Sequence, residues 1–350
     1  MRNFTFKRQL LFVMFMLLGC LSIQAADDGL ITKQITIKLD KAGTLPDKIG
    51  STKKKQITNL KIIGEINGTD WCFIREMAGC DYNCEKTGGK LSMLDLSDAK
   101  IVKGGLPYIK YNGGVYTSND KLGYAAFSDC SGLTSLTIPS SVTSIGEYAF
   151  YGCSGLTSLT IPSNVTSIGE SAFDGCSGLT SLTIPSNVTS IGESAFHGCS
   201  GLTSLTIPSS VTSIGYCAFL GCSGLTSFTI PSSVTSIGWG AFCGCSGLTS
   251  IYVYTEKLPN MGSDVFDGCD AKKCTVYVPK GTYDDYWLSE FGYFENIVEF
   301  EATGINNVVT SNDAKELSRY SVNGQRLSAP TKGLNIVKYS NGSVKKVAVQ

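Results

Sequence analysis

Cysteine is the residue type in this chain of 350 residues whose spacing most invites a chemical reading. Of the 14 cysteines, seven recur at intervals of 23 residues, with a last interval of 24: Cys130, Cys153, Cys176, Cys199, Cys222, Cys245 and Cys269. Zinc sites use closely spaced pairs of cysteines, so these intervals do not predict a metal site. One thiol per unit instead predicts a structural Cys stack, in which each thiol is a small buried side chain and a weak hydrogen-bond partner. We expect no cofactor.

The other cysteines leave their pairing open. Cys72, Cys80 and Cys84 lie together before the repeats, where a secreted protein can oxidise one pair or keep all three as thiols. Cys217 and Cys243 occupy variable positions of neighbouring units, and either a link or two free thiols fits this placement. The sequence does not assign a partner to these cysteines or to Cys274.

Acid–base chemistry has little support in the sequence. His197 is the single histidine, and it occupies a position that differs freely between repeats, as a surface residue does. Glu147, Glu170 and Glu193 share one repeat position and so form a line, whereas a glycosidase needs two carboxylates across a cleft. Residues 122–256 contain no Lys or Arg to neutralise phosphates. We therefore predict no catalytic residues, no metal ligands and no nucleic-acid partner.

The repeat itself predicts the elements that position these residues. Four units contain Leu-Thr-Ser-Leu-Thr-Ile-Pro, and the next has Phe228 at the second Leu. In this segment Leu136 and Ile138 alternate with β-compatible polar residues and predict a short strand that Pro139 ends. Val142 and Ile145 then point inward again. No unit can bury this apolar face alone, so the units must stack into a solenoid with parallel strands.

The polar positions of the predicted strands face outward on the concave sheet. This candidate binding face is an uncharged hydroxyl ladder: Ser135, Thr137, Ser158, Thr160, Ser181, Thr183, Ser204, Thr206, Ser227, Thr229 and Tyr252. Two interpretations remain open, because exposed strand positions also need soluble, β-compatible residues for no further purpose. Candidate variable contacts, four of them expected to be exposed aromatic side chains, are Tyr148, Tyr151, His197, Tyr216 and Trp239.

The unit resembles the BspA-type (Treponema pallidum-type) leucine-rich repeat. The family's repeat has a Leu, a strand, a Pro, a spaced Val, Ile-Gly, Ala-Phe and a Cys at fixed positions. The unit matches this pattern at each of these positions, and the resemblance extends from Leu122 to about Val298. Segments such as Ile57–Ile62 and Val276–Thr282 resemble the ends of proteins in that family. The resemblance implies an α/β repeat solenoid with one short parallel strand per 23-residue coil, capped at both ends. It also implies adhesion to host extracellular proteins such as fibronectin or fibrinogen, or to other bacterial cells.

The N-terminus predicts export. Arg2, Lys7 and Arg8 precede an apolar run of about a dozen residues and the small residues around Ala25, which is the pattern of a cleaved signal peptide. A second reading remains, because Cys20 ends a sequence close to a lipoprotein cleavage box. No other long apolar stretch follows, so we expect no membrane span in the mature chain.

The last segment predicts a small β module. Short strand patterns separated by Asn-Gly and Lys-Gly turns run from Ser318 to Val349. They resemble the C-terminal sorting modules of type IX secretion in Gram-negative bacteria, although an unrelated β domain also fits. The predicted organisation is a signal peptide, an N-terminal cap region, the repeats, a C-terminal cap, a linker and a sorting or anchoring module: residues 1–25, 26–121, 122–269, 270–301, 302–315 and 316–350.

Together these features predict a non-catalytic leucine-rich repeat protein, secreted or on the outer surface of a Gram-negative bacterium. Its partner would be an extracellular protein or glycan bound through the solenoid. A structural surface-layer component is the main alternative, and a secreted enzyme or an ice-binding protein that uses the hydroxyl ladder fits less well. The net formal charge of zero gives no sign of an anionic partner.

Overall fold

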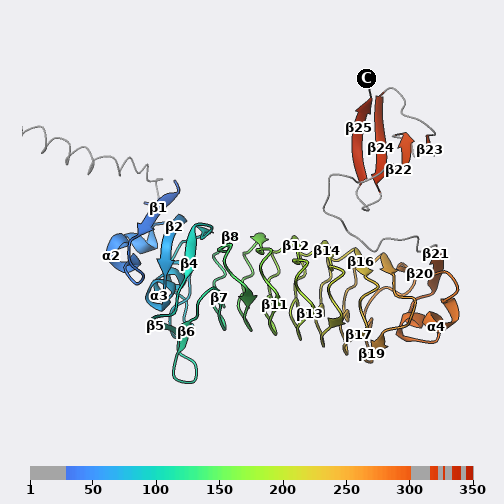
Figure 1. Cartoon of the computed structure of the whole chain (residues 1–350), viewed down its shortest axis with the longest axis horizontal. Helices are drawn as coiled ribbons and strands as arrows, with labels where there is room; N and C mark the ends of the chain where they lie inside the picture. The colour runs from blue at the N-terminus through green and yellow to red at the C-terminus, as the bar shows by residue number, and fades with distance from the viewer. Residues whose placement is uncertain (1–28, 301–315, 322–325, 328–332, 340–343, 350) are drawn as a thin grey trace, which may run out of the picture.

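The computed structural model describes residues 29–300 and the strands of the C-terminal segment. The predicted signal peptide, including Cys20, and the predicted linker at 302–315 lie outside the described residues. The repeats form an elongated stack of coils (Figure 1). The helices α2 (Leu45–Ile49) and α3 (Gly68–Met77) lie at its N-terminal end, and α4 (Tyr283–Trp287) lies at its C-terminal end.

The predicted Ser-Leu-Thr strands form one side of the stack. They are β8 (Ser135–Thr137), β10 (Ser158–Thr160), β12 (Ser181–Thr183), β14 (Ser204–Thr206), β16 (Ser227–Ile230) and β18 (Ser250–Val253). Neighbouring strands are parallel and pair equivalent residues, as in Ser135 with Ser158. The central Leu or Phe of each strand is buried, because side chains alternate between the two sheet faces.

Two sheets make up this side of the stack. One has the order β1-β2-β3-β8-β10, with β4 paired to β2, and the other has the order β12-β14-β16-β18-β20-β21. The two caps add further strands to these sheets: β1 (Ile35–Leu39), β2 (Asn59–Ile66), β3 (Met93–Asp95) and β4 (Ala99–Ile101) in the first sheet, and β20 (Thr275–Pro279) and β21 (Asn296–Phe300) in the second. The parallel pairing of the repeat strands therefore continues into the cap strands at both ends.

Each coil also contains a second strand that the sequence did not predict. These strands form a separate parallel sheet: β7 (Lys121–Leu122), β9 (Ser144–Ile145), β11 (Ser167–Ile168), β13 (Ser190–Ile191), β15 (Ser213–Ile214), β17 (Ser236–Ile237) and β19 (Asn260–Met261). A glycine follows each one from β9 onward, because the coils approach too closely there for a side chain. A Cβ at Gly169 would lie 2.6 Å from the backbone nitrogen of Glu147.

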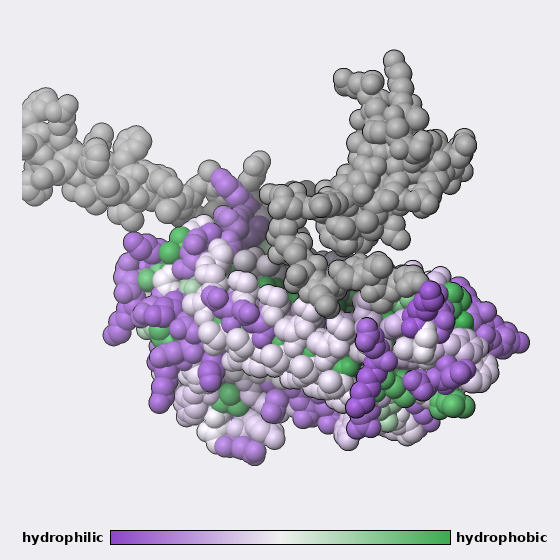
Figure 2. Space-filling model, turned by 45° about the vertical axis from the view of Figure 1, so that its right-hand side comes forward, coloured by the Kyte–Doolittle hydropathy of each residue, from purple (hydrophilic) through white to green (hydrophobic). Residues whose placement is uncertain are grey.

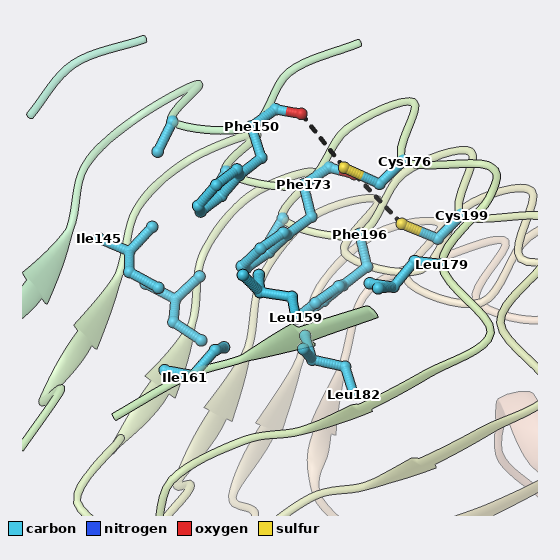
Figure 3. Packing of buried hydrophobic residues seen from close by; sticks show 14 of the residues in the cluster. Ile145, Phe150, Leu159, Ile161, Phe173, Cys176, Leu179, Leu182, Phe196 and Cys199 are labelled. Carbon is cyan, nitrogen blue, oxygen red and sulfur yellow. Dashed lines mark hydrogen bonds between the residues drawn. The ribbon is translucent and has the colours of Figure 1, made fainter. Parts of the chain in front are cut away.

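The core between the two sides is a ladder of identical side chains (Figure 3). Rings of successive coils are nearly parallel, with centroids 5.1–5.9 Å apart from Phe127 to Phe266. The Cys stack lies beside the rings, and its members are buried. Each coil thus covers the apolar face of the next one, as the solenoid prediction requires.

The helix α3 closes the N-terminal end of the Phe ladder. The Trp71 ring packs on Phe127 at 5.1 Å, and its Nε1 donates to the carbonyl of Ala126 at 2.8 Å. Buried Arg75 donates to the carbonyls of Ala125 and Ala126 at 2.9 and 3.1 Å. The same end of the chain contains the 3-10 turn η1 (Lys53–Lys55) and the hairpin strands β5 (Gly104–Ile109) and β6 (Val115–Thr117).

The C-terminal end of the ladder is covered by aromatic residues. Phe291 of the 3-10 turn η2 (Glu290–Tyr293) and Phe294 both contact Phe266 at 5.0 Å between centroids. The C-terminal segment is a separate antiparallel sheet in the order β23-β22-β24-β25. Its strands are β22 (Glu316–Ser321), β23 (Arg326–Leu327), β24 (Gly333–Tyr339) and β25 (Val344–Val349), one short strand more than the sequence predicted.

Candidate binding face

The hydroxyl ladder lies on the solvent side of the repeat strands, where the sequence placed it. Its serines and threonines form two columns, because the strands pair Ser with Ser and Thr with Thr. Most of these side chains are exposed, and Ser135 and Thr229 are half-buried. We call the two columns, with Tyr252 at their end, the strand face. The coils are pale in Figure 2, between hydrophilic residues at the N-terminal end and a mixture of hydrophilic and hydrophobic residues at the C-terminal end.

The ends of the strand face differ chemically, and the sequence interpretation missed both. At the N-terminal end, Lys61 pairs with Asp95 at 3.2 Å and with Asp98 at 2.7 Å. The hydrogen bonds that Lys61 donates to these carboxylates, that to Asp98 first, raise the pKa of Lys61. At the C-terminal end, Tyr252 stacks on Tyr277 with centroids 4.6 Å apart. The alternation around Tyr277 was a signal for this pair, but it was interpreted only as a cap strand.

A slot interrupts the strand face between β10 and β12, which belong to different sheets. The slot has a volume of about 440 Å³. Its lining consists of six hydroxyl residues and three largely buried aliphatic ones: Thr157, Ser158, Thr160, Thr180, Ser181 and Thr183 with Leu159, Ile161 and Leu182. The slot therefore offers mainly hydroxyl groups for hydrogen bonding, with some apolar surface between them.

The candidate variable contacts do not form one cluster. Tyr151 is 42% exposed, but Tyr148 is half-buried and packs against the core, so it is less exposed than the sequence predicts, and its role as a contact stays a prediction. Burial of Tyr148 follows from its neighbours, because its ring contacts both Tyr124 at 5.6 Å and Tyr151 at 6.0 Å. Its hydroxyl lies 3.1 Å from a carboxylate oxygen of Glu170.

His197 is paired rather than independent. Its Nδ1 lies 2.9 Å from Oδ1 of Asp174, which occupies the same position one coil earlier. Burial raises the pKa of Asp174, and the neighbouring His197 partly offsets that effect. Sequence reasoning treated these residues as separate variable positions, although their shared repeat position placed them on adjacent coils.

The Cys stack has the geometry of a structural ladder. From Cys153 onward, each thiol donates to the carbonyl of a Phe in the preceding coil at 3.0–3.4 Å. Burial raises the pKa of Cys176 and of Cys222 to about 12, so both remain protonated at neutral pH. Across the residues that the structure describes, no cluster of His, Cys, Asp and Glu side chains could hold a metal ion.

Among the residues that the structure describes, the cysteines outside the stack are free thiols. In the N-terminal cap, Nη2 of Arg75 contacts Sγ of Cys80 at 3.3 Å and Sγ of Cys84 at 4.0 Å. Burial raises the pKa of Cys80 to about 11 although the Arg75 charge lowers it. Cys217 and Cys243 are half-buried on neighbouring coils.

Comparison with known families agrees with this geometry. The family described as "BspA type Leucine rich repeat region (6 copies)" matches residues 115–226, 166–287 and 218–328. These overlapping segments cover more than half of the 350 residues. The chain belongs to the BspA-type leucine-rich repeat family. No curated protein matches this BspA-type chain.

Solved structures similar to this BspA-type protein are also leucine-rich repeat proteins. A T. pallidum leucine-rich repeat protein is 28% identical, with 49% of this chain and 72% of that chain covered and a TM-score of 0.37. A leucine-rich cell surface protein from Faecalibacterium prausnitzii A2-165 is 26% identical, with 55% and 67% covered and a TM-score of 0.35. A leucine-rich repeat protein from Bacteroides ovatus is 26% identical over the same shares, with a TM-score of 0.24.

Proposed function

We propose that this BspA-type protein is a non-catalytic binding protein, secreted or at the cell surface, whose strand face recognises an extracellular protein or glycan. The observation that carries the proposal is the uncharged strand face with its hydroxyl-lined slot. The aromatic pair at one end, Tyr252 and Tyr277, adds the kind of side chain that is enriched in interfaces. Adhesion to host matrix proteins or to other cells is the biological role that fits such a face.

Display outside the cell is part of the proposal. The predicted signal peptide at 1–25 directs export, and the C-terminal β module at 316–350 serves in type IX sorting or anchoring. We also propose that residues 26–121 form the N-terminal cap of the repeats and residues 270–301 the C-terminal cap. Among the helices of the described residues, none has the length and apolar character needed to cross a membrane.

An array of extracellular matrix proteins and glycans, probed with residues 26–350 and with residues 26–300, tests this function. The array includes fibronectin and fibrinogen. We expect at least one partner to bind both forms with similar affinity, because the strand face lies within residues 59–298. A partner that binds only the longer form would move the binding activity to the C-terminal module, and binding to no array member would refute an adhesive role.

A further inference from the structure

A second groove lies on the other side of the coils, beside the sheet that contains β15, β17 and β19. Its volume is about 440 Å³. Its floor is the backbone of Gly215, Gly238 and Gly262, whose N–H groups donate to the preceding coil at 2.8–2.9 Å. The floor therefore offers no free N–H of these glycines to which an extended peptide could add as a further strand.

Two aromatic side chains stand in and beside this groove. Tyr216 lines it, and Trp239 follows at the same position of the next coil; they are 58% and 47% exposed. The Tyr216 ring lies over Gly238, where a Cβ would come within 2.6 Å of its Cδ1. The indole of Trp239 is held by a hydrogen bond from Nε1 to Oδ2 of Asp264 at 2.9 Å. Both positions keep large apolar ring surfaces in contact with water.

The remaining lining is mixed: Ile214, Ile237 and Met261 are apolar, the other side chains are polar, and none is a cation. Ser213 and Ser236 contribute hydroxyls, Asn260 an amide and Glu193 a carboxylate. Glu193 precedes Tyr216 in the same column, which also contains Glu147 and Glu170. Because the lining includes Glu193 and no Lys or Arg, the groove favours neutral ligands over anionic ones.

We propose that this groove binds a neutral glycan, with the C–H face of a pyranose ring against Tyr216 and with Trp239 beside the groove on the next coil. A pyranose has an apolar face for the aromatic rings and a rim of hydroxyls for Ser213, Ser236, Asn260 and Glu193. The glycine N–H groups are already paired, so in this groove a peptide strand could add only at the edge strand β19. The inference rests on the proposed binding function but assigns a ligand class to a site distinct from the strand face.

Titration calorimetry with four soluble probes tests the site on residues 26–350. Cellotetraose and chitotetraose are neutral probes, tetragalacturonate is anionic, and tetralysine is a basic peptide. We expect a neutral tetraose to bind and Trp239→Ala or Tyr216→Ala to weaken that binding at least tenfold. Trp287→Ala is the matched control, because Trp287 is 46% exposed but lies on α4, away from the groove. This variant should bind as the unchanged protein does.

The outcomes separate the groove from the strand face. Failure of both neutral probes to bind, or equal loss in Trp239→Ala and Trp287→Ala, overturns the glycan assignment. Stronger binding of tetralysine than of either tetraose, lost in Trp239→Ala, overturns it in favour of a basic peptide. Thr183 and Thr206 lie on the strand face. If the groove binds no glycan, the proposed function still stands when an array partner needs these two threonines but not Trp239. Circular dichroism of each variant checks that the exposed substitutions leave the fold unchanged.

Discussion

The thiols from Cys153 to Cys269 each donate a hydrogen bond to the backbone of the preceding coil, so the stack works only while its members are protonated. Burial raises the pKa of Cys130, Cys176 and Cys269 to about 12, above the ordinary value of about 9. In the unfolded chain these thiols would ionise at a lower pH, near their ordinary pKa of about 9. Between those two pH values the native state therefore holds more protons than the unfolded state, and its stability falls as pH rises.

This linkage gives a prediction for alkaline solution. We expect the free energy of unfolding to be level below pH 9 and to drop steeply from pH 9 to pH 12, because several buried thiols act together. In Cys176→Ala the slope should be shallower by about 1.4 kcal/mol per pH unit, the contribution of one proton. Denaturant melts under reducing conditions at several pH values measure it. Identical slopes in both proteins would show that Cys176 ionises equally in the folded chain.

The Phe ladder gives a second prediction at this scale. Phe173 is fully buried between Phe150 and Phe196, so Phe173→Ala should lower the free energy of unfolding by about 3–5 kcal/mol. Ser177→Ala, at an exposed position of the same repeat, is the control and should stay within about 0.5 kcal/mol. Urea melts compare the two. Equal losses would mean that the inward and outward positions are assigned wrongly.

At the scale of elements, the start of α3 depends on one carboxylate. Buried Asp70 accepts hydrogen bonds from the backbone N–H groups of Gly43 at 2.5 Å, Leu45 at 2.9 Å and Asn67 at 3.0 Å. Asp70→Ala leaves these donors without their acceptor, and we expect a loss of about 2–4 kcal/mol. Asp70→Asn keeps one side-chain oxygen and should lose less. Amide exchange at Leu45 should accelerate in the alanine variant, and unchanged exchange would contradict the assigned role.

Sequence patterns predicted the elements unevenly, for physical reasons. The Ser-Leu-Thr strands and the Phe-Cys core were predictable, because alternation and a 23-residue period leave few ways to bury the apolar positions. The second sheet was not, since a two-residue strand such as Ser144–Ile145 has no periodicity to detect. The stack of Tyr252 on Tyr277 was missed because it joins a repeat to a cap. The slot was missed because β10 and β12 have identical sequences.

At the scale of the molecule, contacts run mainly between neighbouring coils, so whole coils should be removable. Deletion of residues 177–199 joins two equivalent positions of the repeat. We expect a folded protein with one cooperative thermal transition at a lower temperature, because one coil and one interface are lost. Size-exclusion chromatography and calorimetry measure the result. A chain without a cooperative transition would argue against a stack of interchangeable coils.

The charge distribution predicts how binding responds to salt. Residues 131–255 contain four acidic groups and no basic ones, so charge pairs cannot dominate contacts on the repeats. Salt screens exposed charges over about 8 Å at physiological ionic strength, but hydroxyl and aromatic contacts depend on it little. The affinity for an array-identified partner should change only a few-fold between low and high salt. A steep loss would point to the Lys-rich turn Lys53–Lys55 of the N-terminal cap.

The most direct test of the strand face compares two double substitutions on opposite sides of neighbouring coils. Thr183→Arg with Thr206→Arg places bulk and charge on the strand face, and Thr166→Arg with Thr189→Arg places them beside the second sheet, all at exposed positions. Surface plasmon resonance measures binding of the array-identified partner to each protein. We predict at least a tenfold weaker affinity for the strand-face variant and an unchanged affinity for the other. Unchanged binding by the strand-face variant would contradict the account.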